Sequence, residues 1–214
     1  TSGLPTVGVR VPDHPLTRSL LKFADLPVAA PSANPFGRLS PTTAEHVRQQ
    51  LGNRVDVILD GGPCRVGVES TILQISNDEA ILLRPGGVPQ EAIESLIGKI
   101  SLPTQVSKSV PTAPGMLESH YAPRTRLKII ENSTEIPKGT RTGLISLSGP
   151  IPTGITAAEI LSPTGNLVEA ASRFFQALHR LDQAKLDLIC AHKFPDQGLG
   201  RALNDRLRRA AHGS

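Results

Sequence analysis

Aromatic side chains are scarce in this sequence of 214 residues, where they make up 3%; there is no Trp, and Tyr121 is the single Tyr. The core must therefore be built from Leu, Ile, Val and Ala. A protein that binds single-stranded nucleic acid by stacking bases on rings is disfavoured, because it needs rings that this chain lacks. The remaining composition, with 20% charged residues, is typical of a globular protein and not of a disordered one.

Cysteine is equally rare. Cys64 and Cys190 are the only two, they lie far apart, and neither belongs to a CxxC pair. A disulfide framework and a structural zinc site are therefore poor interpretations, and a reducing, cytoplasmic location is expected. Cys64 is better explained as a passive side chain than as a nucleophile. The six histidines form no H-x-x-x-H or H-E-x-x-H pattern, which disfavours metalloenzyme chemistry.

Long apolar runs and the common nucleotide fingerprints are also missing. No run approaches the roughly 20 residues needed to span a bilayer, and no charged-then-apolar leader opens the sequence, so we expect no membrane partner. Neither G-x-x-x-x-G-K-[ST] nor G-x-G-x-x-G occurs. Methionine occurs only at Met116, and the sequence begins with Thr1, so we expect the native start of translation to lie outside it.

The charge balance is mildly basic. The sequence holds 23 Lys and Arg against 19 Asp and Glu, a net charge of +4. This excess suits a phosphate-bearing ligand or a transient RNA contact, although such an excess is more often a solvated surface. The same two interpretations apply to the arginines of the last expected helix, for which a solvated face is the more common meaning. They are Arg201, Arg206, Arg208 and Arg209.

The first part of the chain, residues 1–102, predicts an α+β sheet domain. Ser40 as N-cap, with Pro41 in the first turn, predicts a helix that ends near Gly52. Hydrophobic periodicity and turn residues place the other elements. The expected strands are 6–11, 26–30, 55–60, 70–75 and 80–83, and the other expected helices are 15–24 and 91–100.

A proline-rich linker is expected over 103–125, followed by a small three-layer α/β domain of Rossmann-like type over 126–214. The single Tyr and the single Met lie inside this otherwise polar linker, which indicates a segment that docks onto another part of the protein, although a fold anchor would look the same. In the last domain the expected strands are 127–130, 142–147 and 186–191, and the expected helices are 166–181 and 199–211.

Two groups of residues could bind an anion. Ser32 and Asn34 are two positions apart in an extended stretch after Pro31, so both side chains should project to one side, although an isolated Ser-x-Asn more often bonds its own backbone. Arg10 and Arg84 end expected strands and could grip a carboxylate or a phosphate, although each alone is more often a solvated charge.

Taken in order, these pieces resemble the YrdC-type domain of the threonylcarbamoyl-AMP synthase family. The motifs are Thr-Val-x-Val-Arg-x-Pro-x-His-Pro at 6–15, Ala-Pro-Ser-Ala-Asn at 30–34, Gly-Arg-Leu-Ser-Pro-Thr at 37–42, Glu-Ser-Thr-Ile at 69–72 and Leu-Arg-Pro-Gly at 83–86. The segments 114–116 and 119–123 resemble the linker of the long, two-domain form, and 198–200 with 204–207 resemble its C-terminal domain. The resemblance covers essentially the whole chain.

The resemblance implies synthesis of threonylcarbamoyl-adenylate from L-threonine, bicarbonate and ATP, with Mg²⁺ accompanying ATP and release of pyrophosphate. The product would feed a downstream transferase complex that modifies tRNA. Attack of a carbamate oxygen on the α-phosphate needs positioning and electrostatic stabilisation, so no residue is assigned as nucleophile or general base.

By the same resemblance, two sets of residues would hold the substrates. Those expected to contact ATP are Thr6, Ser32, Asn34, Ser40 and Arg84, with Tyr121 closing over the nucleotide. Those expected to hold threonine or its carbamate are Arg10, the Ala30 backbone and Ser70. A closing linker would keep water from the adenylate.

The sequence departs from the family in one respect. Members carry a Lys-x-Arg phosphate-binding motif upstream of Ser-x-Asn, and this sequence begins after that point. We therefore expect that about half of the catalytic domain lies outside the sequence. Either this chain alone is inactive, or the missing half is supplied by residues outside this sequence or by a separate chain. A non-catalytic tRNA-binding or regulatory module remains the alternative. The related carbamoyl-transfer domains of hydrogenase maturation are disfavoured, because they carry CxxC pairs.

Overall fold

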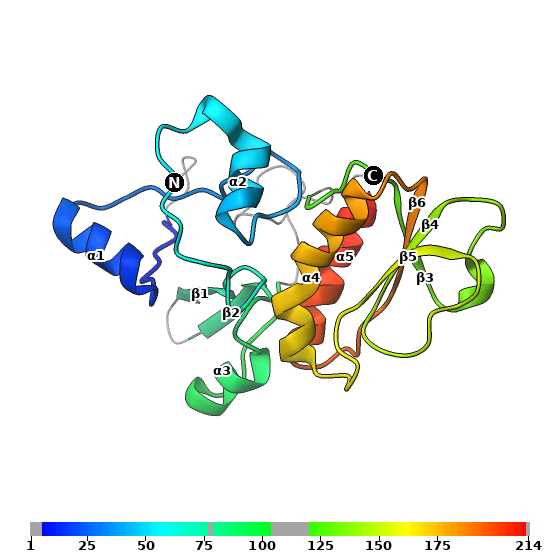
Figure 1. The fold of residues 1–214 in the computed structure, drawn as a ribbon. Coiled ribbons are helices and arrows are strands. Elements are labelled where there is room, and N and C mark those ends of the chain that lie inside the picture. The colour runs from blue at the N-terminus through cyan, green and yellow to red at the C-terminus, as the bar shows by residue number, and fades with distance from the viewer. Residues whose placement is uncertain (1–5, 77–78, 104–119, 213–214) are drawn as a thin grey trace.

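The computed structural model describes residues 6–76, 79–103 and 120–212. Figure 1 shows the N-terminal elements on one side of a pair of long helices and a sheet on the other. The N-terminal elements are α1 (Pro15–Ala24), α2 (Ala44–Leu51), the 3₁₀ helix η1 (Gly52–Arg54), β1 (Ile72–Ser76), β2 (Glu79–Arg84) and α3 (Gln90–Ile97). The C-terminal elements are β3 (Leu127–Ile130), η2 (Ser133–Glu135), β4 (Thr142–Ser146), β5 (Ile155–Ile160), α4 (Leu167–Gln183), β6 (Leu188–His192) and α5 (Leu199–His212).

The larger sheet is parallel and has the strand order β3-β6-β4-β5. Helices α4 and α5 cover one of its faces (Figure 1). The inner face of α4 carries two adjacent, fully buried aromatic residues, Phe174 and Phe175, and α5 contributes Leu203 and Leu207 to the same core. The strands and helices expected over 127–130, 142–147, 166–181, 186–191 and 199–211 are thus confirmed, with ends that shift by a few residues.

The three-layer expectation is wrong in one respect. The second face of the sheet is covered by a smaller apolar cluster around Ile130, Leu144 and Cys190, against which Ile136 packs. The chain between β3 and β4 forms only η2 there, because Pro137 and then Gly139, with a φ of +74°, stop a helix after one turn. β5 was not expected, since Ala157, Ala158 and Glu159 at its centre have little strand propensity.

The strands expected over 70–75 and 80–83 are confirmed as β1 and β2, with ends that shift by up to two residues. They pair antiparallel as a hairpin, and Ser76 is the register partner of Glu79. The helices expected over 15–24 and 91–100 are present as α1 and α3, although α3 ends at Ile97 because Gly98 turns the chain with a φ of +85°. Within the described residues no helix is both long and apolar enough to cross a membrane.

Three of the expected strands are wrong: residues 6–11, 26–30 and 55–60 are irregular. A strand needs a neighbour to pair its backbone N–H and C=O groups, and no described segment pairs with these three. Their apolar side chains consequently face outwards: Val9 is 79% exposed and Val11 is 92% exposed.

The start of α2 also differs from the expectation. The N-cap is Thr43, whose hydroxyl accepts the His46 amide at 3.2 Å, and Pro41 lies before the helix. The Ser40 hydroxyl is directed elsewhere, to the Glu69 carboxylate. The expected end at Gly52 is confirmed by its φ of +53°. Most of the expected linker, residues 104–119 with Met116, lies outside the described residues.

Candidate functional site

The motifs Glu-Ser-Thr-Ile (69–72) and Leu-Arg-Pro-Gly (83–86) contact each other at the base of the β1–β2 hairpin. Ile72 and Arg84 are partners in the β1–β2 register. Beyond the strands, the Thr71 hydroxyl donates to the Val88 carbonyl at 2.6 Å and accepts the Val88 amide at 3.0 Å. A Cβ at Gly86 would lie 2.3 Å from the Ser70 backbone carbon, so only glycine fits there. The two motifs therefore form one rigid platform.

Arg84 belongs to this platform and is 7% exposed. Its Nε and Nη2 atoms donate to the Ser70 carbonyl at 3.2 and 2.9 Å, and Nη2 lies 3.4 Å from the Ser70 hydroxyl. Burial lowers the pKa of the guanidinium, and a hydrogen bond with the Tyr121 side chain partly opposes this change. The side chain remains a cation in the normal pH range, because an arginine pKa lies far above neutrality.

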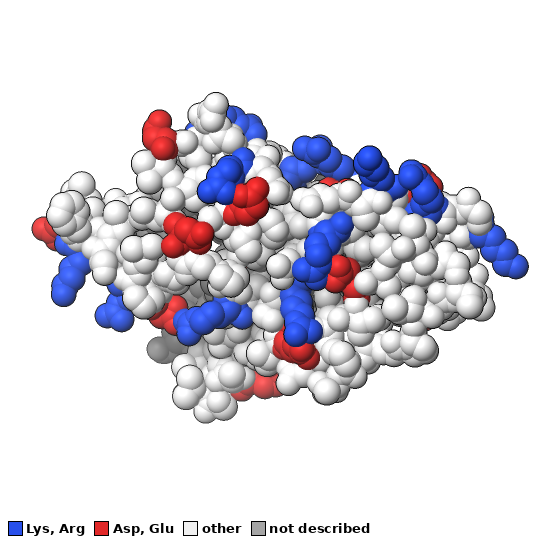
Figure 2. All heavy atoms as spheres, viewed as in Figure 1, with Lys and Arg blue, Asp and Glu red and all other residues white. Residues whose placement is uncertain are grey.

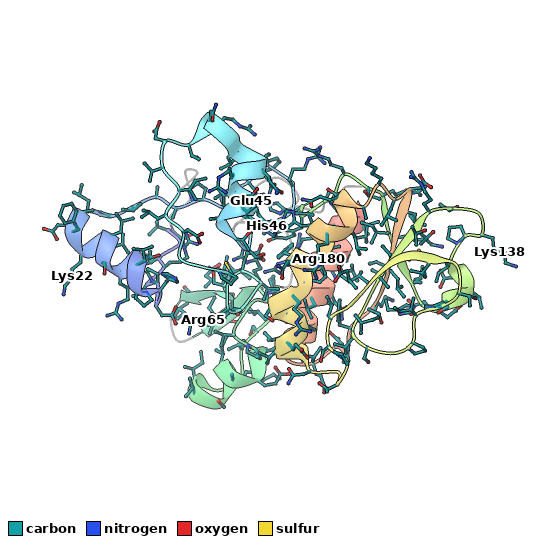
Figure 3. All side chains as sticks on the ribbon, in the orientation of Figure 1. Lys22, Glu45, His46, Arg65, Lys138 and Arg180 are labelled. Carbon is teal, nitrogen blue, oxygen red and sulfur yellow. The ribbon has the colours of Figure 1, made fainter. Side chains whose placement is uncertain are left out.

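Ser40 is held from two sides. Its hydroxyl donates to Glu69, and its carbonyl oxygen lies 3.1 Å from Nε2 of His179 on α4. His179 in turn stacks on His46 of α2, with ring centroids 3.9 Å apart. Figure 3 shows His46 between α2 and α4, with Arg180 on α4 close by. Ser40 therefore lies where the N-terminal elements meet the C-terminal helices.

Tyr121 is 1% exposed and has a φ of +64°, a left-handed conformation that costs a non-glycine residue about 1 kcal/mol or more. Packing holds it there: its ring lies 5.6 Å from that of Phe175, and the next residue, Ala122, donates its amide to Gly37 at 2.8 Å. Burial raises the pKa of the phenol, partly opposed by the charge of Arg206. The phenol is therefore neutral at ordinary pH.

We call this group the Arg84 cluster, defined as the side chains that converge between the hairpin, residues 120–122 and α5. Its members are Ser40, Glu69, Ser70, Arg84, Tyr121 and Arg206. It unites four of the nine residues proposed from the sequence, contributed by three segments far apart in the chain.

The other five residues lie on exposed or half-buried segments outside this cluster. Arg10 donates to the Ala30 carbonyl, so two residues assigned to threonine meet each other. Asn34 Nδ2 donates to the carbonyls of Pro35 and Arg38 at 3.0 and 3.1 Å, which is the local turn described as the alternative for this residue. The remaining two, Thr6 and Ser32, make no side-chain hydrogen bond to another described residue.

Glu69 and Arg206 were not proposed as site residues. Arg206 was grouped with a solvated face of the last helix, and this is wrong for that residue, which is fully buried. Helical spacing alone cannot distinguish it from its neighbour Arg208, whose side chain is 66% exposed. The signal that could have found Arg206 is the Asn-Asp-Arg-Leu motif at 204–207, which places an acid directly before it.

The described residues contain no group of three His, Cys, Asp or Glu side chains that could hold a metal ion. Desolvation, and then the Glu69 charge, raise the pKa of Cys64, which is the opposite of what an activated thiol needs. A buried arginine beside hydroxyl groups, as Arg84 lies beside Ser70, suits the binding of phosphate oxygens.

Comparison with known proteins gives two family matches. A family model described as "Telomere recombination" matches residues 1–86, and one described as "Threonylcarbamoyl-AMP synthase, C-terminal domain" matches residues 88–212, which is more than half of the chain. This chain belongs to the threonylcarbamoyl-AMP synthase family. The resemblance stated from the motifs is thereby confirmed.

Members of this family align along the whole chain. The threonylcarbamoyl-AMP synthase of Bacillus subtilis is 41% identical over 227 residues, and that of Pyrococcus abyssi is 39% identical over 222 residues. These alignments cover 100% and 99% of this chain but 65% of each relative. The solved structure of P. abyssi Sua5 complexed with L-threonine superposes with a TM-score of 0.87 at 36% identity, over 99% of this chain and 65% of that one.

Proposed function

We propose that this chain carries part of the active site of an enzyme that makes threonylcarbamoyl-adenylate from L-threonine, bicarbonate and ATP and releases pyrophosphate. Membership of the threonylcarbamoyl-AMP synthase family supports the reaction. The observation that carries the assignment to particular residues is the meeting of Ser40, Arg84 and Tyr121 in one buried cluster. Together they offer a cation and a hydroxyl, which suit phosphate oxygens, and an aromatic ring, which suits contact with a nucleoside triphosphate.

The chemistry fits such a site. When a carbamate oxygen attacks the α-phosphate, negative charge is shared by the phosphoryl oxygens and the departing pyrophosphate. Arg84 would offset that charge, and its firm attachment to Ser70 means that little reorganisation is needed during the reaction. In this proposal Mg²⁺ enters with ATP as part of the substrate, since Mg²⁺ is commonly bound through substrate phosphates.

The remaining assignments are proposals of the same kind. Thr6, Ser32 and Asn34 would complete the ATP site. Threonine would lie with its carboxylate or carbamate near Arg10, the Ala30 backbone and Ser70, and the contact between Arg10 and Ala30 supports this grouping. The solved relative that is described as complexed with L-threonine supports the class of substrate.

We propose the division of the chain given by its composition: part of a YrdC-type catalytic domain over 1–102, a linker over 103–125 and an α/β domain over 126–214. Because this chain spans 65% of its relatives, we further propose that catalysis requires sequence corresponding to the rest of them. The outward-facing apolar side chains of 6–11 and 55–60 are consistent with a surface that other residues cover.

The test is release of pyrophosphate from ATP by the protein expressed from its own full reading frame. We expect release that requires both L-threonine and bicarbonate. Arg84→Met should abolish it, whereas Arg48→Met, which removes an exposed arginine paired with Glu45 on α2, should leave it unchanged. Pyrophosphate release that continues without threonine, or that survives in R84M, would contradict the proposal.

The second candidate is a non-catalytic module that binds tRNA. The observation in its favour is the row of Lys and Arg side chains that Figure 2 shows along the upper edge of the molecule. Binding of that kind should weaken steeply with added salt and should not depend on ATP. Salt-sensitive tRNA binding without any ATP binding would favour this module over the enzyme.

A further inference from the structure

Among the described residues, Arg206 is the largest side chain that is fully buried, although it carries a charge. It belongs to α5, at the far end of the chain from the hairpin. Nε donates to the Glu69 carboxylate at 2.8 Å, and Nη1 donates to the Pro85 carbonyl at 2.9 Å. Its guanidinium carbon also lies 5.2 Å from the centre of the Tyr121 ring. One side chain of the C-terminal helix thus reaches both motifs of the platform and the tyrosine.

Such burial is costly for a charged group unless partners compensate it. Asp205, from the same helix, accepts from Nη1 at 2.7 Å and is itself held by Arg209. Burial alone would raise the pKa of Glu69, but the Arg206 charge and the hydrogen bonds of Ser40 and Arg206 outweigh it, so the pKa lies below its ordinary value. Glu69 is therefore a carboxylate, and it links Arg206 to the Ser40 hydroxyl.

We propose that Arg206 is a positioning residue for the nucleotide half of the site, acting through Glu69 on Ser40 and through ring contact on Tyr121. This inference rests on the proposed function, because Ser40 and Tyr121 matter only if they meet ATP. It assigns a task to the C-terminal domain: α5 fixes two ATP-binding groups without touching the nucleotide. Threonine-binding groups are not among the direct partners of Arg206, so its effect should be specific to ATP.

The sequence supplies an unusually clean probe for this proposal. Tyr121 is the only Tyr and there is no Trp, so the intrinsic fluorescence of the 214-residue chain reports on Tyr121 alone. Collisional quenching by acrylamide measures how accessible that ring is. In the wild-type chain the ring is 1% exposed, and we expect a low quenching constant.

The variants are chosen so that one of them keeps the test valid if another fails to fold. Arg206→Met removes the cation and leaves the half-buried Glu69 carboxylate without it. The double variant Arg206→Met with Glu69→Gln leaves no uncompensated carboxylate. Arg206→Lys keeps the positive charge but loses the planar guanidinium, which donates to several acceptors at once. Arg208→Met is the matched control, because Arg208 lies on the same helix and also pairs with Asp205 but is mostly exposed.

We expect quenching of Tyr121 to rise several-fold in R206M and in the double variant, to rise less in R206K, and to stay at the wild-type value in R208M. Circular dichroism and cooperative melting identify the variants that remain folded. A folded double variant whose Tyr121 is quenched as weakly as in the wild type overturns the proposal, whatever happens to R206M.

The ratio of KM for ATP to KM for threonine distinguishes a positioning role from a merely structural one, because general destabilisation would not change KM for ATP alone. In the protein expressed from its full reading frame, the double variant should raise KM for ATP about tenfold or more while changing KM for threonine by less than about threefold. Equal losses for both substrates would overturn the specific role. If the wild-type protein neither binds nor consumes ATP, the proposed function fails, and the quenching comparison still decides whether Arg206 holds Tyr121.

Discussion

Close backbone approach at Gly86 explains why glycine follows Arg84-Pro85. A Cβ there would lie 2.3 Å from both the Ser70 carbon and the Thr71 nitrogen, and these are backbone atoms that cannot rotate away. We expect Gly86→Ala to lower the free energy of unfolding by about 1–3 kcal/mol, the usual cost of overpacking. Urea unfolding measures this change.

Gly8→Ala is the matched control for that substitution. A Cβ at Gly8 meets nothing within 4 Å, and its φ is not in the left-handed region. The free energy of unfolding of G8A should therefore stay within a few tenths of a kcal/mol of the wild-type value. Equal midpoints for G86A and the wild type would show that the two motifs are less closely packed than described.

At the residue scale, sequence patterns predicted which residues belong to the site better than they predicted the contacts of those residues. Ser40 was expected both to cap a helix and to meet ATP, and the structure gives the cap to Thr43 and directs Ser40 to Glu69. Arg84 could be chosen because an arginine at the end of a strand suits an anion. Glu69, which accepts from Ser40, and the buried Arg206 that pairs with Glu69 lie 137 positions apart, and no local pattern connects them.

The contact between α2 and α4 depends on two histidines, and this predicts how stability varies with pH. Burial, and then the charge of His179, lower the pKa of His46 to about 4 from 6.5, and burial also lowers that of His179. Glu45 on α2 and Asp182 on α4 favour the protonated rings, whereas Arg180 on α4 disfavours them.

A depressed histidine pKa means that the unfolded chain binds more protons than the folded chain between about pH 4 and 6.5. The stabilising contribution is complete above pH 6.5 and is lost as the pH falls towards 4. We expect the wild-type free energy of unfolding to decline from about pH 7 to about pH 5, where most carboxyls remain ionised, and to decline less in His46→Gln. Identical slopes for both proteins would contradict this account.

The first turn of α4 depends on one cap. The Asn166 side chain accepts the amides of Val168 and Glu169 at 2.8 and 3.1 Å. Asn166→Ala should lower the free energy of unfolding by about 1 kcal/mol, because two helix amides lose their acceptor. Thermal unfolding of the Asn166→Ala variant measures this loss. Asn53→Ala, which changes an exposed residue of η1, is the control. A loss of stability of equal size in both variants would contradict the capping role of Asn166.

At the scale of elements, prediction from sequence succeeded where periodicity and local pairing are sufficient. The helices α1, α4 and α5 and the β1–β2 hairpin carry their signals within a short stretch of chain. The segments 6–11, 26–30 and 55–60 have the composition of strands, but a strand also requires a neighbour, which composition cannot supply. Within the described residues that neighbour is absent.

At the scale of the whole molecule, the N-terminal and C-terminal parts differ in how fully their apolar side chains are buried. The sheet with α4 and α5 has a continuous buried core, whereas the N-terminal part has a two-stranded sheet and many outward-facing apolar residues. Since this chain covers 65% of its relatives, we expect the 214-residue chain alone to release no pyrophosphate, while the protein from its full reading frame does. Steady release by the isolated chain, dependent on threonine and bicarbonate, would show that the matched part is sufficient.

The central claim is that Arg84 and Tyr121 serve one ATP site, and the most direct measurement is the ATP dissociation constant across a double-mutant cycle. Calorimetry on the full-reading-frame protein would compare the wild type, Arg84→Lys, Tyr121→Phe and the double variant, with Arg48→Met as control. Because the two side chains share a hydrogen bond, the account predicts weaker ATP binding in each single variant and a combined loss smaller than the sum. ATP affinity that is unchanged in both single variants would contradict it.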